Sequence, residues 1–155
     1  MQDVIHKLYD RIILVQAFWE QLSEEQRRAK ASPEKWSIKE VLGHLVDSAQ
    51  TNIRRLIVGQ YQAEAHIVYQ QNHWVQAADY QHYDSQNLML LWVLLNKHFA
   101  QVLNKLPTEK YGVLTNWGKN AIPKNKEKDL VSLELVAYDY IQHLDHHLRQ
   151  MGLNI

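Results

Sequence analysis

Apolar residues recur at helical spacing over four long stretches of the chain, and no stretch shows a convincing strand-like alternation. In the first stretch one stripe is formed by Ile5, Leu8, Ile12, Val15 and Trp19. The pattern predicts four long helices, over Val4–Leu22, Ser37–Gly59, Ser85–Leu106 and Ser132–Met151.

Residues at the ends of these stretches favour helix starts and stops. Ser37, with Glu40 three residues later, is typical of a capping box, and Gly59 is a candidate C-cap. Pro107 ends the third helix. In the fourth, an acidic residue lies in the first turn and a basic one in the last, which suits the helix dipole.

Two of the connections are long. Tyr61–Tyr83 includes a candidate short helix around Trp74–Tyr80, and Thr108–Val131 is polar. Long crossings do not suit an up-down-up-down bundle. We therefore expect an all-α, overhand four-helix bundle, built as a single domain over residues 1–155.

Charge and composition exclude several functional classes. The formal net charge is zero, whereas proteins that bind nucleic-acid phosphates carry a basic excess or stripe. The one dense basic stretch, Lys119–Lys128, is interpreted as a solvated loop, so we expect no nucleic-acid partner. The chain has no cysteine, which excludes disulfides, thiolate metal sites and cysteine nucleophiles.

The sequence shows neither a membrane span nor a secretion signal. No apolar run approaches the ~20 residues that a helix needs to cross a bilayer. The first helix carries charged residues among its apolar ones and lacks the pattern of a signal peptide. We expect a cytoplasmic protein without a membrane partner.

The nine histidines are numerous for this length, but most have no ligand-like spacing. Five of them lie among polar neighbours and are interpreted as surface or partly buried residues. These are His6, His66, His73, His82 and His98.

The fourth helix carries a histidine pair at a spacing that suits a shared metal. His143 and His147 are four residues apart and project from one face of a helix. At about 100° per residue, His147 lies roughly 50° from the centre of the apolar stripe and His143 roughly 90°. His146 lies about 150° away and should point to water. The alternative is a half-buried, hydrogen-bonded pair without metal.

A third ligand should come from another helix, and His44 is the best candidate. It lies about 120–140° from the apolar stripe of its own helix, so a surface histidine is the alternative. Ser48, one turn beyond His44 on the same side of the helix, is a candidate to orient the imidazoles.

Other polar residues near these histidines have less specific readings. Asn52 and Arg55 could contact a substrate or anion, but a buried salt bridge or cap bond is the favoured reading. Asp47, Asp139 and Asp145 project outward by the same angular argument, so no general base is assigned. Two aromatic residues of the first long connection, Tyr69 and Trp74, are candidates to line a pocket mouth.

Three segments together resemble a known family. WSIKEVLGHLVDSAQTNIRRL and YDYIQHLDHHLRQM are similar to the N- and C-terminal motifs of the DinB/YfiT-like superfamily, and NHWVQAADY resembles a stretch of one bacterial branch. The resemblance implies an up-down-down-up bundle, often a homodimer. It also implies a mononuclear metal site formed by His44, His143 and His147.

The implied site allows more than one function. Three imidazoles with an open position are typical of catalytic zinc, and imidazole also suits nickel. We therefore expect a divalent metal, zinc or nickel, and a metal-dependent enzyme, either a thiol S-transferase or a hydrolase, acting on a small-molecule substrate. The alternative is a non-catalytic metal-binding bundle that acts through dimerisation or a protein partner.

Overall fold

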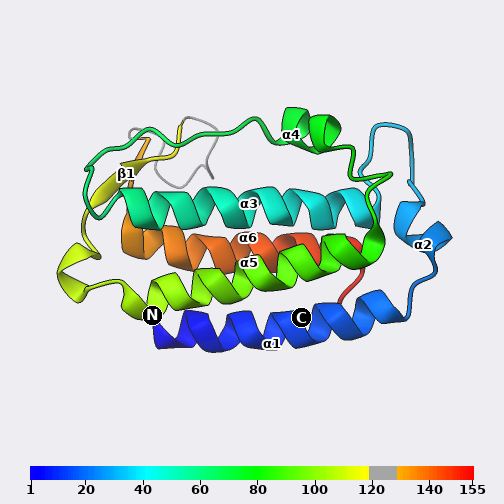
Figure 1. Cartoon of the computed structure of the whole chain (residues 1–155), viewed down its shortest axis with the longest axis horizontal. Coiled ribbons are helices and arrows are strands. Elements are labelled where there is room, and N and C mark those ends of the chain that lie inside the picture. The colour runs from blue at the N-terminus through cyan, green and yellow to red at the C-terminus, as the bar shows by residue number, and fades with distance from the viewer. Residues whose placement is uncertain (119–128) are drawn as a thin grey trace.

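Four long helices form the body of the protein in the computed structural model, which describes residues 1–118 and 129–155 (Figure 1). They are α1 (Gln2–Glu20), α3 (Ile38–Val58), α5 (Ser85–Lys105) and α6 (Leu133–Met151). All four predicted helices are confirmed, and each end lies within two residues of the predicted one.

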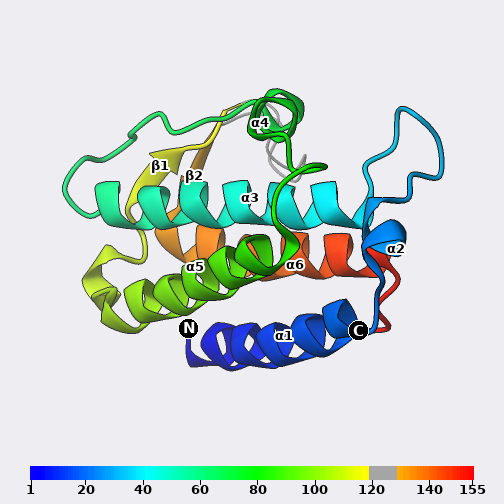
Figure 2. The ribbon, with the colours of Figure 1, turned by 45° about the vertical axis from the view of Figure 1, so that its right-hand side comes forward.

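The directions of the helices confirm the overhand topology. α1 and α6 run one way while α3 and α5 run the other, which gives the order up-down-down-up (Figures 1 and 2). α3 packs against both α5 and α6, and α1 packs against the same two helices from the opposite side. The parallel pair α3 and α5 requires the long crossover between them.

Local sequence signals fix the ends of α3 and α6. The Ser37 hydroxyl accepts from the Glu40 amide at 3.1 Å, and the Glu40 carboxylate accepts from the Ser37 amide at 2.8 Å. This confirms the capping box, and Gly59 is the C-cap as expected. Gly152 ends α6 with a φ of 104°, a left-handed conformation that glycine adopts without strain.

The connections hold shorter elements, some expected and some not. These are α2 (Glu24–Arg28), α4 (Gln71–Ala78), the 3-10 turn η1 (Thr108–Lys110) and the strands β1 (Leu114–Asn116) and β2 (Leu130–Ser132). α4 confirms the predicted short helix. The two strands were not predicted, because three-residue strands are too short to show an alternating pattern.

β1 and β2 pair antiparallel, with Thr115 opposite Val131, just before α6 begins. The basic stretch at 119–128 lies outside the described residues. Within the described part of the chain, no helix has the length and apolar character needed to cross a membrane.

The face of α3 that points away from the bundle is polar but buried. Its buried polar side chains are Lys39, Glu40, His44, Asp47, Ser48, Thr51, Asn52 and Arg55. The connection from α3 to α5 passes over α3 (Figure 1) and is tied to this face by hydrogen bonds. Arg55 donates to the Ile67 carbonyl at 2.8 and 3.0 Å, and Tyr80 donates to Asp47 at 2.6 Å.

The outward orientation predicted for Asp47 was therefore wrong. Its side chain is 3% exposed, because the crossover covers the part of α3 that lies opposite the apolar stripe. The polar face of α3 is a second buried interface, and it carries the candidate functional site.

Candidate metal centre

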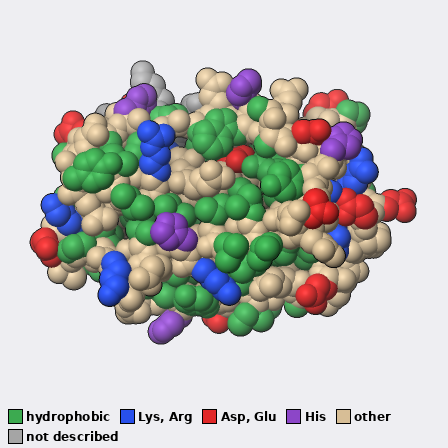
Figure 3. All heavy atoms as spheres, in the orientation of Figure 1, with side chains coloured by type: hydrophobic (Ala, Val, Ile, Leu, Met, Phe, Trp, Pro, Cys, Tyr) green, Lys and Arg blue, Asp and Glu red, His purple; other side chains and the backbone are tan. Residues whose placement is uncertain are grey.

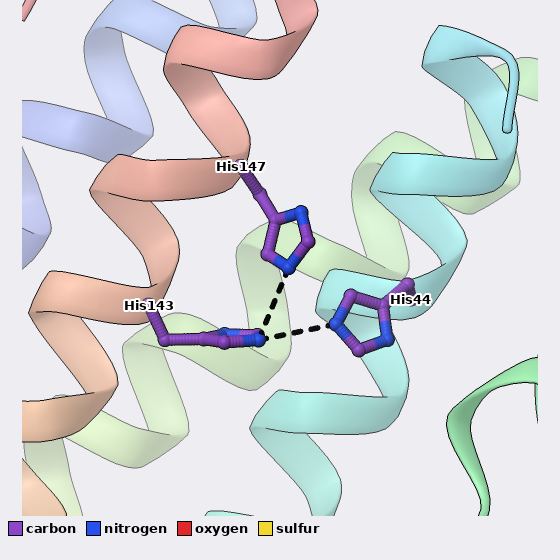
Figure 4. Close-up of side chains that lie close together, drawn as sticks. All are labelled: His44, His143 and His147. Atoms are coloured by element: carbon purple, nitrogen blue, oxygen red, sulfur yellow. Dashed lines mark hydrogen bonds between the residues drawn. The ribbon is translucent and has the colours of Figure 1, made fainter. Parts of the chain in front are cut away.

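Three histidine side chains converge between α3 and α6 (Figure 4). His143 Nε2 lies 3.2 Å from His44 Nε2 and 3.1 Å from His147 Nε2. His44 is 0% exposed and His147 is 9% exposed, while His143 is half-buried. The structure thus brings together the three residues that the sequence analysis selected.

The spacing of the three nitrogens fits one metal ion. Metal–nitrogen bonds of about 2.0–2.1 Å at tetrahedral angles place two imidazole nitrogens about 3.3 Å apart. The observed separations of 3.1 and 3.2 Å are close to this value. Within residues 1–118 and 129–155, the cluster comprises these three histidines without a carboxylate. The donor set among the described residues is therefore three imidazole nitrogens.

Hydrogen bonds at Nδ1 orient two of the three rings. His147 Nδ1 lies 2.9 Å from Gln150 Oε1, and His143 Nδ1 lies 3.4 Å from Ser48 Oγ. An amide oxygen is an acceptor only, so His147 carries its proton on Nδ1 and turns the Nε2 lone pair toward the cluster. Ser48, the residue that the sequence offered for orienting an imidazole, contacts His143. Gln150 was not singled out from the sequence, although it follows the second histidine in the family motif.

The histidines are held neutral, the form that binds metals. Burial, followed by the proximity of His143 and His147, lowers the pKa of His44 to about 2. Burial and the neighbouring His147 lower the pKa of His143 to about 3. Burial also lowers the pKa of His147, and its hydrogen bond to Gln150 acts in the opposite direction.

Aromatic residues flank the cluster on the His44 side. The Trp36 and His44 ring centroids are 5.0 Å apart, and those of Tyr69 and His44 are 6.2 Å apart. Tyr69 in turn contacts Trp74, with centroids 5.2 Å apart. Trp74 and Asp47 help to line a hollow of about 400 Å³ on the outer surface. Trp74 thus lines this hollow, while Tyr69 is not among its lining residues and contacts both Trp74 and the His44 ring.

The acidic residues of the two helices have other partners. Asp145 binds Arg11 of α1 at 2.7 Å, on the side away from the histidines, as expected. Asp139 was expected to point outward, but it is half-buried and its charge acts on Arg55. Asp47 accepts from Tyr80, and burial raises its pKa to about 6.

Arg55 and Asn52 have structural roles in the described contacts. The Arg55 guanidinium donates to the Ile67 carbonyl and, at 3.0 Å, to Asn52 Oδ1. Asn52 donates to the Ser48 carbonyl at 2.9 Å. Burial lowers the pKa of Arg55 to about 10, so the residue stays charged at neutral pH. Both side chains are buried, but in the described contacts Arg55 donates to a backbone carbonyl and an amide oxygen, so the expected salt bridge or cap bond is not what holds it.

The remaining histidines are surface residues. His146 points to solvent, which confirms that the i, i+4 pair is the inward one. The five other histidines are also exposed: His6, His66, His73, His82 and His98.

The fold and the cluster define a class of protein, an overhand four-helix bundle with a buried three-histidine centre. The chain belongs to the DinB superfamily, whose model matches residues 13–151 and so spans all three histidines. No curated protein matches the sequence.

A solved structure shows the same fold. YfiT from Bacillus subtilis, described as a probable metal-dependent hydrolase with an unusual four-helix bundle topology, matches with a TM-score of 0.82. The match covers 99% of this chain and 88% of YfiT, at 19% sequence identity. At this identity the likeness establishes the fold alone.

Proposed function

We propose that this protein is a metal-dependent enzyme whose ligands are His44, His143 and His147, with zinc or nickel as the metal. It acts on a small molecule, as a hydrolase or a thiol S-transferase. The observation that carries the proposal is the convergence of three neutral Nε2 atoms without a fourth ligating side chain among the described residues.

An incomplete ligand set favours catalysis over a structural role. Structural zinc sites are closed by four protein ligands, whereas catalytic sites use three and leave one position open. A bound metal supplies Lewis acidity at that position. Gln150 and Ser48 hold the Nε2 lone pairs of His147 and His143 toward the centre. Trp36 and Tyr69 pack beside the His44 ring, with ring centroids 5.0 and 6.2 Å away.

Two reactions fit this site. Membership of the DinB superfamily and the description of YfiT support hydrolysis. Thiol transfer requires a nucleophile from outside the chain, because the sequence has no cysteine. The thiol would therefore be a low-molecular-weight co-substrate, held as its thiolate, which is the nucleophilic form.

The test is a measurement of bound metal in protein purified without an affinity tag or chelator. We expect about one equivalent in the wild type and none in His143→Ala, because two imidazoles seldom hold a metal. His146→Ala is the matched control, since this neighbouring histidine points to solvent, and it should retain the full equivalent. Wild-type protein that takes up neither zinc nor nickel would overturn the proposal.

A non-catalytic bundle that acts through dimerisation or a protein partner is the second candidate. The complete burial of His44 favours it, because a sealed metal is typical of a structural site. Cobalt-loaded protein distinguishes the two candidates. A change in its visible absorption on adding azide or 2-mercaptoethanol would show an open position and support the enzyme. An unchanged spectrum would support the sealed site.

A further inference from the structure

The three candidate ligands differ in how their second ring nitrogens are satisfied. The Nδ1 atoms of His143 and His147 have partners in Ser48 and Gln150. His44 Nδ1 is fully buried, points away from the other two histidines (Figure 4), and has no hydrogen-bond partner among the described residues. An imidazole that binds a metal through Nε2 carries a proton on Nδ1, so this atom is a buried donor that needs an acceptor.

An unused acceptor lies one turn further along the same helix. Asp47 Oδ2 is also buried and without a partner in the part of the chain that the structure describes. Residues three apart on a helix are neighbours on its surface. Among residues 1–118 and 129–155, four buried side-chain polar atoms have no partner, and only these two share a helix turn. One of them donates and the other accepts.

The rest of the Asp47 side chain is firmly held. Its Oδ1 accepts the Tyr80 hydroxyl at 2.6 Å, and the Tyr80 ring lies directly over Gly43, where a Cβ atom would overlap it. Tyr80 belongs to the segment that follows α4, so the crossover itself fixes the carboxylate. A carboxylate held by one oxygen presents the other in a constant direction.

We propose that Asp47 is the positioning residue for His44. One buried water molecule accepts the Nδ1–H of His44 and donates to Oδ2 of Asp47. Buried waters typically bridge polar groups that would otherwise be unsatisfied. The link fixes the His44 tautomer with the Nε2 lone pair toward the metal and makes the imidazole a stronger ligand. The inference rests on the proposed metal function and adds the third orienting contact to those made by Ser48 and Gln150.

The first test is zinc affinity, measured by competition with a chelating dye. We expect Asp47→Asn to bind zinc about 10- to 100-fold more weakly, as is typical when a partner that orients a ligand is lost. Glu40→Gln is the matched control, because it makes the same chemical change in a buried carboxylate one turn before His44. It should change the affinity by less than about threefold, since Glu40 contacts Ser37 and Lys30 and not the histidines.

The second test is spectroscopic. Its signal, the Nδ1 proton of His44, would not change if Asp47 had a purely structural role. Nitrogen-15 NMR of zinc-loaded protein should show a slowly exchanging Nδ1 proton on His44. In Asp47→Asn this signal should shift and exchange faster, while the signals of His143 and His147 stay unchanged. If Asp47→Asn does not fold, Tyr80→Phe decides, because it frees Asp47 Oδ1 while keeping the carboxylate. It should weaken zinc binding and shift only the His44 signal.

The outcomes separate this inference from the proposed function. Wild-type protein that binds no zinc would overturn both. The positioning role alone would be overturned if the wild type binds zinc and Asp47→Asn leaves both the zinc affinity and the His44 signal unchanged. If Asp47→Asn does not fold, the same result in Tyr80→Phe would overturn it.

Discussion

Helices α3 and α5 have the same length, 21 residues, and run parallel to each other, but their outward faces are opposite in character. The outward face of α3 is polar and buried under the crossover. The outward face of α5 is apolar in part and exposed, with Leu90 at 55% and Leu94 at 54% exposure. Hydrophobic side chains accordingly gather across the face of the molecule in Figure 3.

This difference shows that the polarity of a helix face does not by itself tell which side meets solvent. Polar groups inside a protein need partners, and α3 obtains them from the crossover and from α6. A buried polar face also provides what a metal site requires, namely neutral imidazoles held in fixed positions. The candidate ligand His44 therefore lies on the helix face that would ordinarily be assigned to solvent.

Among substitutions on the outward faces of α3 and α5, removing the buried Arg55 guanidinium should have the largest effect on stability. Arg55→Met keeps a side chain of similar length but leaves the Ile67 carbonyl and Asn52 Oδ1 without their donor. We expect the free energy of unfolding to fall by about 3 kcal/mol, measured by urea denaturation. Arg54→Met, at the exposed neighbouring position, should change it by less than about 0.5 kcal/mol. Equal effects of the two substitutions would mean that the crossover does not seal this face.

Filling the space under Tyr80 should have the next largest effect. A Cβ atom at position 43 would overlap the Tyr80 ring, so Gly43→Ala must displace the crossover from α3. We expect a loss of about 2 kcal/mol in thermal or urea unfolding, despite the higher helix propensity of alanine. Gly112→Ala is the control, because nothing lies within 4 Å of its added methyl group, and it should be nearly neutral. A stabilised Gly43→Ala variant would contradict the close packing of this face.

The buried histidines should make metal-free protein sensitive to acid. Burial lowers the pKa values of His44 and His143 to about 2 and about 3. Below about pH 6.5 these two side chains therefore bind protons in the unfolded chain and stay neutral in the folded protein. The stability contributed by keeping these histidines neutral is therefore fully present above about pH 6.5. It declines as the pH falls toward the folded pKa values, by up to about 1.4 kcal/mol per pH unit for each histidine.

Urea midpoints measured in a chelator from about pH 7.5 to pH 5 would record this decline. In the double variant His44→Gln and His143→Gln the profile should be flatter over the same range. A profile as steep as that of the wild type would show that these two imidazoles do not cause the loss.

The sequence predicted the bundle because each long helix carries its own signals. The apolar stripes and the cap residues Ser37, Gly59 and Gly152 depend on neighbours within the same segment. The pair His143 and His147 was selected in the same way, from the angular position of each residue on one helix. Features that depend only on neighbours within one segment can therefore be predicted from the sequence pattern.

The opposite face of α3 could not be predicted in that way. Periodicity placed His44 away from the core and Asp47 toward solvent, because it detects burial by apolar neighbours and not burial under a polar connection. His44 was the best candidate for a third ligand although its periodicity spoke against it, and the family motif strengthened that choice. The contacts of Ser48 and Gln150 depend on side-chain rotamers and on the packing of α6 against α3, which no single segment encodes.

The smallest effect is expected on the exposed face of α5. Leu94→Lys removes an apolar side chain that is already 54% exposed, so the free energy of unfolding should change by less than about 0.5 kcal/mol. Leu88→Lys is the buried counterpart on the same helix. It should prevent folding or destabilise the protein by roughly several kcal/mol. Light scattering of Leu94→Lys completes the comparison. An unchanged molar mass would confirm that solvent covers this face, and a reduced mass would place on it the homodimer that the family resemblance implies, making both outward faces buried.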